Sequence, residues 1–141
     1  MFKSNSTHSY ERTSEDVEIS VVPELVPDRS NFEDLYYFKY TVSISNHRDK
    51  DIQVLSRHWI IRSGDGLTEE VEGDGVVGEQ PVISPGETYS YESYCPLPVP
   101  TGNMRGSYFA KDQDGESLVL KIPLFFLRAE SPDSSVSRLF H

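Results

Sequence analysis

The sequence predicts an all-β fold, an antiparallel sandwich of about seven strands, and two observations support this. First, apolar side chains alternate with polar ones in several separate segments, which is the period of a strand with one buried face. Second, turn-forming Gly, Pro, Asp and Ser residues interrupt these segments about every ten residues. No long segment shows the 3.6-residue periodicity of an amphipathic helix.

Three segments carry the alternation most clearly. Val17, Ile19 and Val21 share one parity in the first segment, and the second runs from Tyr36 to Ile44. The third covers residues 118–126, where Pro123 interrupts an otherwise regular pattern. Because proline has no N–H to donate to a central ladder, we expect Pro123 at a sheet edge or in a bulge.

Four weaker segments complete the set, at residues 52–62, 67–72, 87–94 and 106–111. Hairpin turns are predicted at residues 63–66 and 112–115, and a type II turn at Ser84-Pro85-Gly86. Antiparallel strands with short turns form either a sandwich or a barrel. The number of strands favours an immunoglobulin or fibronectin type III-like sandwich, and a small barrel is the alternative.

The length of 141 residues fits one domain. Residues 1–13 are polar and predict a flexible N-terminal tail, residues 14–128 form the domain, and residues 129–141 predict a polar C-terminal tail.

Charge and cysteine content exclude several classes of protein. The chain has 13 Lys and Arg against 23 Asp and Glu, a net charge of −10, which disfavours nucleic acid and anionic lipid as partners. Cys95 is the single cysteine, so an internal disulfide and a cysteine-rich zinc site are excluded. Since no apolar leader or long apolar run occurs, we expect a cytoplasmic protein without membrane contact.

Gly73, Gly75 and Gly78 form a G-x-G-x-x-G pattern. In dinucleotide-binding folds this pattern ends a strand and begins a helix, whose N-terminus holds the pyrophosphate. Here Pro81 and a predicted turn follow at once, and the acidic side chains of the loop, including Glu79, would repel phosphate. We interpret the pattern as a bend between antiparallel strands, with a backbone nest for pyrophosphate as the alternative.

Arg57, His58 and Trp59 lie in one predicted strand. The period of two places Arg57 and Trp59 on one face and His58 on the other, and Trp59 is expected in the core. Arg57 then either stacks on an aromatic ring or pairs with a loop acid such as Glu79. The alternative is that Arg57 and His58 flank the glycine loop as an anion or partner site. For a small anionic ligand bound at the loop, Arg57 or Arg105 would be the counter-charge.

Signatures of catalysis and of metal binding are missing from the sequence. The four histidines, at positions 8, 47, 58 and 141, never stand at ligand spacing on one element, so we predict no metal site. No G-x-S-x-G or other nucleophile motif occurs. We therefore expect no cofactor and no enzymatic activity.

Four motifs in order resemble the ApaG family. They are Ser56-Arg57-His58-Trp59, the run from Gly73 to Pro81, Ser84-Pro85-Gly86-Glu87, and the run from Gly102 to Tyr108. The resemblance covers approximately residues 14–127 and implies a fibronectin type III-like sandwich without a firmly attached catalytic activity. It also implies a role as a protein-binding module, as in eukaryotic F-box proteins that contain similar domains, and a link of bacterial members to cobalt and magnesium tolerance.

The sequence thus favours a non-catalytic module that binds a protein, either an unidentified partner or a second copy of this chain. Tyrosines at positions 37, 89, 91 and 94 are candidates for an exposed patch that the partner covers. The alternative is a small-ligand module that binds pyrophosphate or a nucleotide at the glycine loop. The candidate binding residues are Arg57, His58, Gly73, Gly75, Gly78, Glu79 and Arg105.

Overall fold

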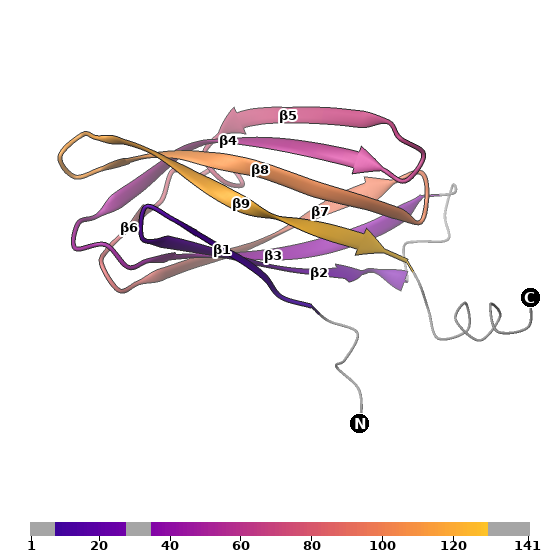
Figure 1. Cartoon of the computed structure of the whole chain (residues 1–141), viewed down its shortest axis with the longest axis horizontal. Coiled ribbons are helices and arrows are strands. Elements are labelled where there is room, and N and C mark those ends of the chain that lie inside the picture. Colours follow the sequence, from indigo (N-terminus) through magenta and orange to yellow (C-terminus); the bar gives the residue numbers. More distant parts are fainter. Residues whose placement is uncertain (1–7, 28–34, 130–141) are drawn as a thin grey trace, which may run out of the picture.

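The computed structural model describes residues 8–27 and 35–129, and these form nine strands (Figure 1). The strands are β1 (Tyr10–Ser14), β2 (Val17–Leu25), β3 (Tyr36–Asn46), β4 (Ile52–Ser63), β5 (Thr68–Asp74), β6 (Val82–Ile83), β7 (Thr88–Leu97), β8 (Thr101–Asp112) and β9 (Ser117–Arg128). Within these residues no helix has the length and apolar character that crossing a membrane would require.

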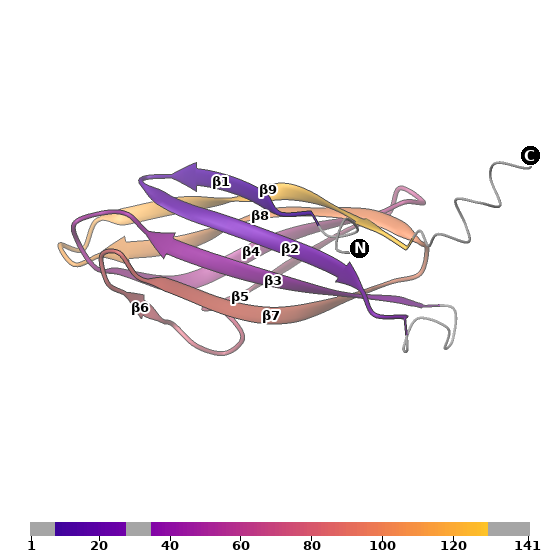
Figure 2. The same cartoon turned by 90° about the horizontal axis from the view of Figure 1, so that it is seen from below.

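Two antiparallel sheets form the layers of a sandwich (Figures 1 and 2). One has the strand order β1-β2-β3-β7, and the other has the order β5-β4-β8-β9, with the short β6 also paired to β4. The predicted antiparallel sandwich is confirmed, and each of the seven predicted segments overlaps a strand. The barrel alternative is wrong, because the described strands belong to two separate sheets.

Strands β1 and β6 were not predicted from the sequence. Strand β1 begins at Tyr10, inside the segment expected to be a flexible tail, and pairs with β2 through five residues that include Glu11, Arg12 and Thr13. Strand β6 has only two residues, opposite Ile52 and Gln53. Most of both predicted tails, residues 1–7 and 130–141, lies outside the described residues. Ala129, the first residue of the predicted C-terminal tail, packs against the core and donates its amide to Pro100 O at 2.8 Å.

The core between the sheets is centred on Trp59, as predicted, and only 3% of this residue is exposed. Its ring meets Tyr40, Phe125 and Tyr108 edge-on, with ring centroids 5.4, 5.9 and 6.3 Å away. Such pairs contribute about 0.5–1.5 kcal/mol each beyond the area that they bury. Since Tyr40 lies in one sheet and Trp59 in the other, this cluster fixes the two layers against each other.

Two irregularities set which side chains point into the core. The register of β8 and β9 shifts between Met104 and Gly106, opposite Pro123, so the prediction of a bulge or edge position for this proline is confirmed. In β4 the register shifts at Leu55. Because of this extra residue, Arg57 and Trp59 follow Val54 on the inner face of the sheet.

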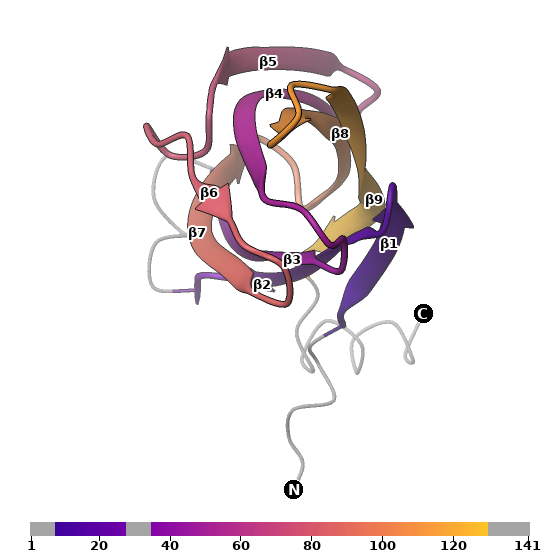
Figure 3. The same cartoon turned by 90° about the vertical axis from the view of Figure 1, so that its left-hand side faces the viewer.

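The sandwich is asymmetric at its two sides. On one side β1 runs beside β9, where the backbone N–H of Lys121 donates to the hydroxyl of Ser14 at 3.1 Å (Figure 3). On the other side β5 and β7 are the last strands of their sheets, and no ladder joins them among the described residues. We call the space between β5 and β7 the seam.

Phe125 and Phe126 offer a direct test of the core, because they are neighbours on β9 that face opposite sides. Phe125 is fully buried against Trp59 and Tyr40, whereas Phe126 is 39% exposed. We expect Phe125→Ala to lower the free energy of unfolding by about 3–5 kcal/mol. The matched control Phe126→Ala should lower it by less than about 1 kcal/mol. Urea denaturation measures both, and equal losses would contradict this assignment of faces.

Candidate functional site

A cleft opens into the seam, and it has a volume of about 300 Å³. Strands β4 and β5 contribute Trp59, Ile61, Glu69 and Val71, and β7 contributes Ser93, Tyr94 and Cys95. Most of the lining residues are apolar or aromatic, and Arg57 and Glu69 add one cation and one carboxylate. Cavities of this size with few polar groups are typical of binding sites for small ligands or single side chains.

The strand pattern explains the lining of the cleft. Alternate residues of β7 point inward, so Ser93 and Cys95 face the core while Tyr94, which is 51% exposed, stands at the rim. On β5 the same alternation turns Val71 inward and the acidic residues on either side of it outward. Because both strands are sheet edges, their outer backbone groups border the cleft.

Burial raises the pKa values of Cys95 in the cleft and of the tyrosines beside and below it. It raises the pKa of the Cys95 thiol to about 12, so this cysteine remains protonated at neutral pH. Burial also raises the pKa values of Tyr40 and Tyr91, and the Tyr91 hydroxyl hydrogen-bonds the hydroxyl of Tyr108. These shifts lead away from the neutral range in which general acids and bases work.

Arg57 points into the protein beside the glycine loop and supports its backbone. Its Nη1 donates to the carbonyl oxygens of Asp74 at 2.8 Å and Gly75 at 3.1 Å. A side chain at Gly73 would meet this guanidinium, since an added Cβ would lie 2.9 Å from Nη2. The predicted pairing of Arg57 with Glu79 is therefore wrong: backbone carbonyls are its hydrogen-bond acceptors.

The glycine loop is a tight hairpin bend, as predicted, and no helix follows it. Val77 and Gly78 both have positive φ, 47° and 82°, which is the geometry of a type I′ turn. The amides of Val76 and Glu79 donate to each other's carbonyls at 2.7 and 2.9 Å, and the amide of Gly75 donates to Leu55 O at 2.7 Å. Since these amides already have acceptors, the geometry does not favour a pyrophosphate nest here.

Glu79 connects the glycine loop to the opposite sheet through a hydrogen bond. The hydroxyl of Tyr89 on β7 donates to its Oε1 at 3.3 Å. Burial, and after it the charge of Glu79, raises the pKa of Tyr89, so this donor keeps its proton at neutral pH. The contact bridges one end of the seam and leaves the cleft open beyond it.

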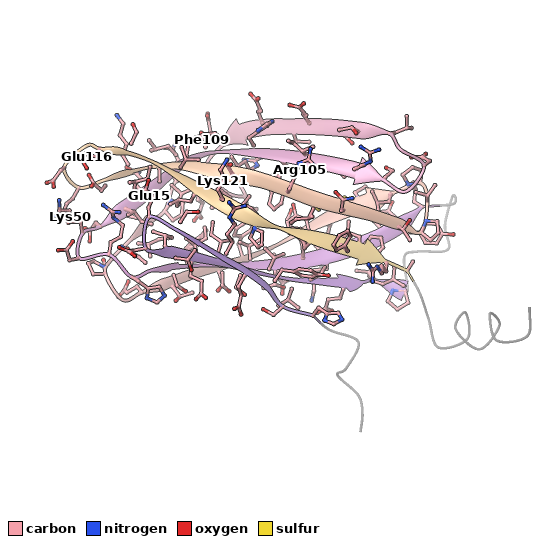
Figure 4. The ribbon with its side chains drawn as sticks, in the orientation of Figure 1. Glu15, Lys50, Arg105, Phe109, Glu116 and Lys121 are labelled. Atoms are coloured by element: carbon pink, nitrogen blue, oxygen red, sulfur yellow. The ribbon has the colours of Figure 1, made fainter. Side chains whose placement is uncertain are left out.

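His58 and Arg105 are the remaining predicted side chains. His58 is on the outer face of β4, as the period of two predicted, and its Nε2 lies 2.9 Å from Glu70 Oε1. Arg105 is on β8 opposite Ile60, so strand β4 separates it from the glycine loop on β5. Figure 4 shows Arg105 and Phe109 on β8 and Lys121 on β9. The structure thus places Arg57, His58 and Gly73 around one hollow of about 360 Å³, with Glu79 at the far end of the loop, and leaves Arg105 apart from them.

Comparison with known proteins agrees with this architecture. A family model of the ApaG domain matches residues 27–112. The ApaG protein of Methylocella silvestris is 44% identical over 84% of this chain and 92% of its own length. The ApaG protein of an Acidovorax species is 47% identical over 82% of this chain and 85% of its own length. The crystal structure of an ApaA protein from Bordetella pertussis superimposes with a TM-score of 0.78 at 46% identity, covering 80% of this chain and 93% of that one.

Fold and seam together define a small antiparallel β-sandwich module in which, within the described residues, β5 and β7 end their sheets without pairing to each other. The sequence comparisons make its relationship plain, and they confirm the resemblance read from the four motifs. The chain belongs to the ApaG family.

Gly75 and Gly78 distinguish a constrained loop position from an open one. A Cβ at Gly75, which has φ +58°, would lie 1.8 Å from the carbonyl oxygen of Glu79, whereas a Cβ at Gly78 would meet nothing within 4 Å. We expect Gly75→Ala to lower the free energy of unfolding by at least about 3 kcal/mol. Gly78→Ala should lower the free energy of unfolding by only about 1–2 kcal/mol, which is the cost of placing a side chain on a left-handed backbone. Urea denaturation compares them, and a Gly75→Ala protein as stable as Gly78→Ala would refute the hairpin geometry.

Proposed function

We propose that this protein is a non-catalytic module that binds a protein partner, and that an extended segment of the partner docks along the seam. The observation that carries the proposal is the pair of strands β5 and β7, which end their sheets without a further partner strand among the described residues and lie on either side of a cleft with an aromatic and apolar floor. An extended segment adds a strand to such an edge through backbone hydrogen bonds, and pockets for alternate side chains provide specificity.

The lining of the cleft and the rim support this mode of binding. One apolar side chain of the partner would fill the space beside Trp59, Ile61 and Val71, while Tyr94 at the rim provides an aromatic contact. Tyr89 and Tyr91 lie on the same strand but face inward, where their hydroxyl groups contact Glu79 and Tyr108, so of the three β7 tyrosines predicted as an exposed patch it is Tyr94 that lines the cleft. The partner's binding energy would come mainly from these aromatic contacts.

Charge indicates what kind of segment fits. Glu69 of β5 lines the cleft, and Glu70, Glu72 and Glu92 lie on the outer faces of β5 and β7. A segment with Lys or Arg next to its apolar anchor is complementary to these acids, and opposite charges also accelerate encounter. The proposed partner is therefore an extended basic and apolar segment, whether it belongs to another protein or to a second copy of this chain.

The proposed absence of catalysis, the cytoplasmic location and the link to metal tolerance each have separate support. The absence of catalysis is supported by the raised pKa values of Cys95 and the neighbouring tyrosines. A cytoplasmic location fits a single buried cysteine. The link to cobalt and magnesium tolerance stays a prediction that rests on the family resemblance alone.

Site-specific photo-crosslinking in the cells that make the protein tests the docking site. We expect benzoylphenylalanine at position 94 to crosslink a partner, because Tyr94 stands at the rim of the cleft. The matched control is Val119 on β9, which is 41% exposed but lies on the opposite side of the sandwich. Val71→Trp, which fills the cleft, should abolish the crosslink while the thermal unfolding of the protein remains cooperative.

Mass spectrometry of the crosslinked peptide then tests its chemistry, which should be basic and apolar. A partner that crosslinks through position 119 and not through position 94 would refute docking at the seam. A crosslinked species of twice the chain's mass would identify the partner as a second copy.

A further inference from the structure

Three potential metal ligands meet on the outer face of the sheet that contains β4 and β5. His58 lies directly opposite Glu72 in the ladder, and Glu70 is two residues before Glu72 on the same strand. Because alternate residues of a strand share a face, the three side chains project to the same outer side. This face is separate from the seam, so the inference does not depend on the proposed docking site.

The distances between the ligand atoms suit a shared ion. His58 Nε2 lies 2.9 Å from Glu70 Oε1 and 3.8 Å from Glu72 Oε2, and one ligand atom of each residue lies within 4.8 Å of the others. In a tetrahedral site with bonds of about 2.0–2.2 Å, neighbouring ligand atoms are about 3.4 Å apart. Small rotations of the exposed glutamates would therefore complete the geometry without any movement of the strands.

The ligand types select a class of metal. One imidazole nitrogen and two carboxylate oxygens favour first-row transition-metal dications such as Zn²⁺, whereas Mg²⁺ prefers oxygen ligands and retains its waters. Two carboxylates also supply the negative charge that a dication requires.

The surroundings of His58 leave room for further ligands. Its side chain is 26% exposed and therefore held by its neighbours, while those of Glu70 and Glu72 are 61% and 76% exposed. A hollow of about 360 Å³ opens beside the cluster, and it is bordered by His58, Glu72 and Asp74 and also by Arg57, whose guanidinium is bound to the backbone carbonyls of Asp74 and Gly75. Water or a partner's side chain can occupy the open coordination position there.

We propose that His58, Glu70 and Glu72 bind one transition-metal dication of the Zn²⁺ class. A simple histidine–carboxylate ion pair is the alternative, and the same chain contains one for comparison. His47 Nε2 lies 3.8 Å from Glu18 Oε1, in the sheet that contains β2 and β3. His47 does not belong to the three-ligand cluster. His47 is therefore the matched control.

Calorimetric titration of the full chain with ZnCl₂, after treatment with EDTA, tests the proposal. We expect one site in the wild type and a loss of affinity of at least about tenfold in His58→Gln and in Glu70→Gln/Glu72→Gln. The control His47→Gln should bind as the wild type does, and millimolar Mg²⁺ should not compete. All substituted side chains are on the surface, and ¹H–¹⁵N spectra verify that each variant is folded.

Histidine ring resonances locate the ion in the same titration. Zinc-dependent shifts should appear at His58 and be absent at His47. Unchanged affinity in folded His58→Gln would overturn the proposal, as would shifts confined to His8 or His141. The lack of any saturable binding by the wild type would also overturn it.

Discussion

The way in which the two sheets meet is the constraint on which the candidate site depends. The aromatic contacts of Trp59 with Tyr40 and Phe125 hold the layers together at the centre, and β1 lies against β9 at one side. At the other side β5 and β7 end their sheets without pairing to each other in the described part of the chain. The cleft exists because the core is closed on one side only.

Arg57 connects this architecture to the glycine loop. The extra residue at Leu55 turns Arg57 inward, and its guanidinium binds the carbonyls of Asp74 and Gly75 where β5 ends. The type I′ bend then returns the chain toward β6, and Tyr89 holds Glu79 from the opposite sheet. A glycine pattern associated with dinucleotide binding here serves to close one end of the seam, because no helix begins after it.

Free sheet edges carry a risk of aggregation, and both strands of the seam have features that reduce it. Strand β5 has four acidic residues in seven positions, and β7 contains Pro96, which cannot donate to an added strand. Identical edges of two copies would bring the acids of β5 against each other. The same charges that oppose edge-to-edge aggregation thus favour a basic segment as the partner.

The alternation of apolar residues was sufficient to predict the sandwich and the opposite faces of Trp59 and His58, because a period of two is a local property. Strand β1 was missed since Glu11, Arg12 and Thr13 have no apolar alternation, and its position depends on pairing with β2. The hydrogen-bond acceptors of Arg57 are backbone carbonyl groups, which every residue has, so the sequence does not indicate which of them Arg57 binds. Glu70 and Glu72 meet His58 only through the register of β4 and β5, which histidine spacing along the chain does not reveal.

Amide hydrogen exchange along β7 tests the open seam most directly. In an edge strand, alternate amides point away from the sheet and have no acceptor, so every second amide between Thr88 and Tyr94 should exchange rapidly in the isolated protein while its neighbours are protected by β3. Uniform protection along β7 would mean that the seam is already occupied or closed, and it would contradict a free edge at which a partner's strand can dock.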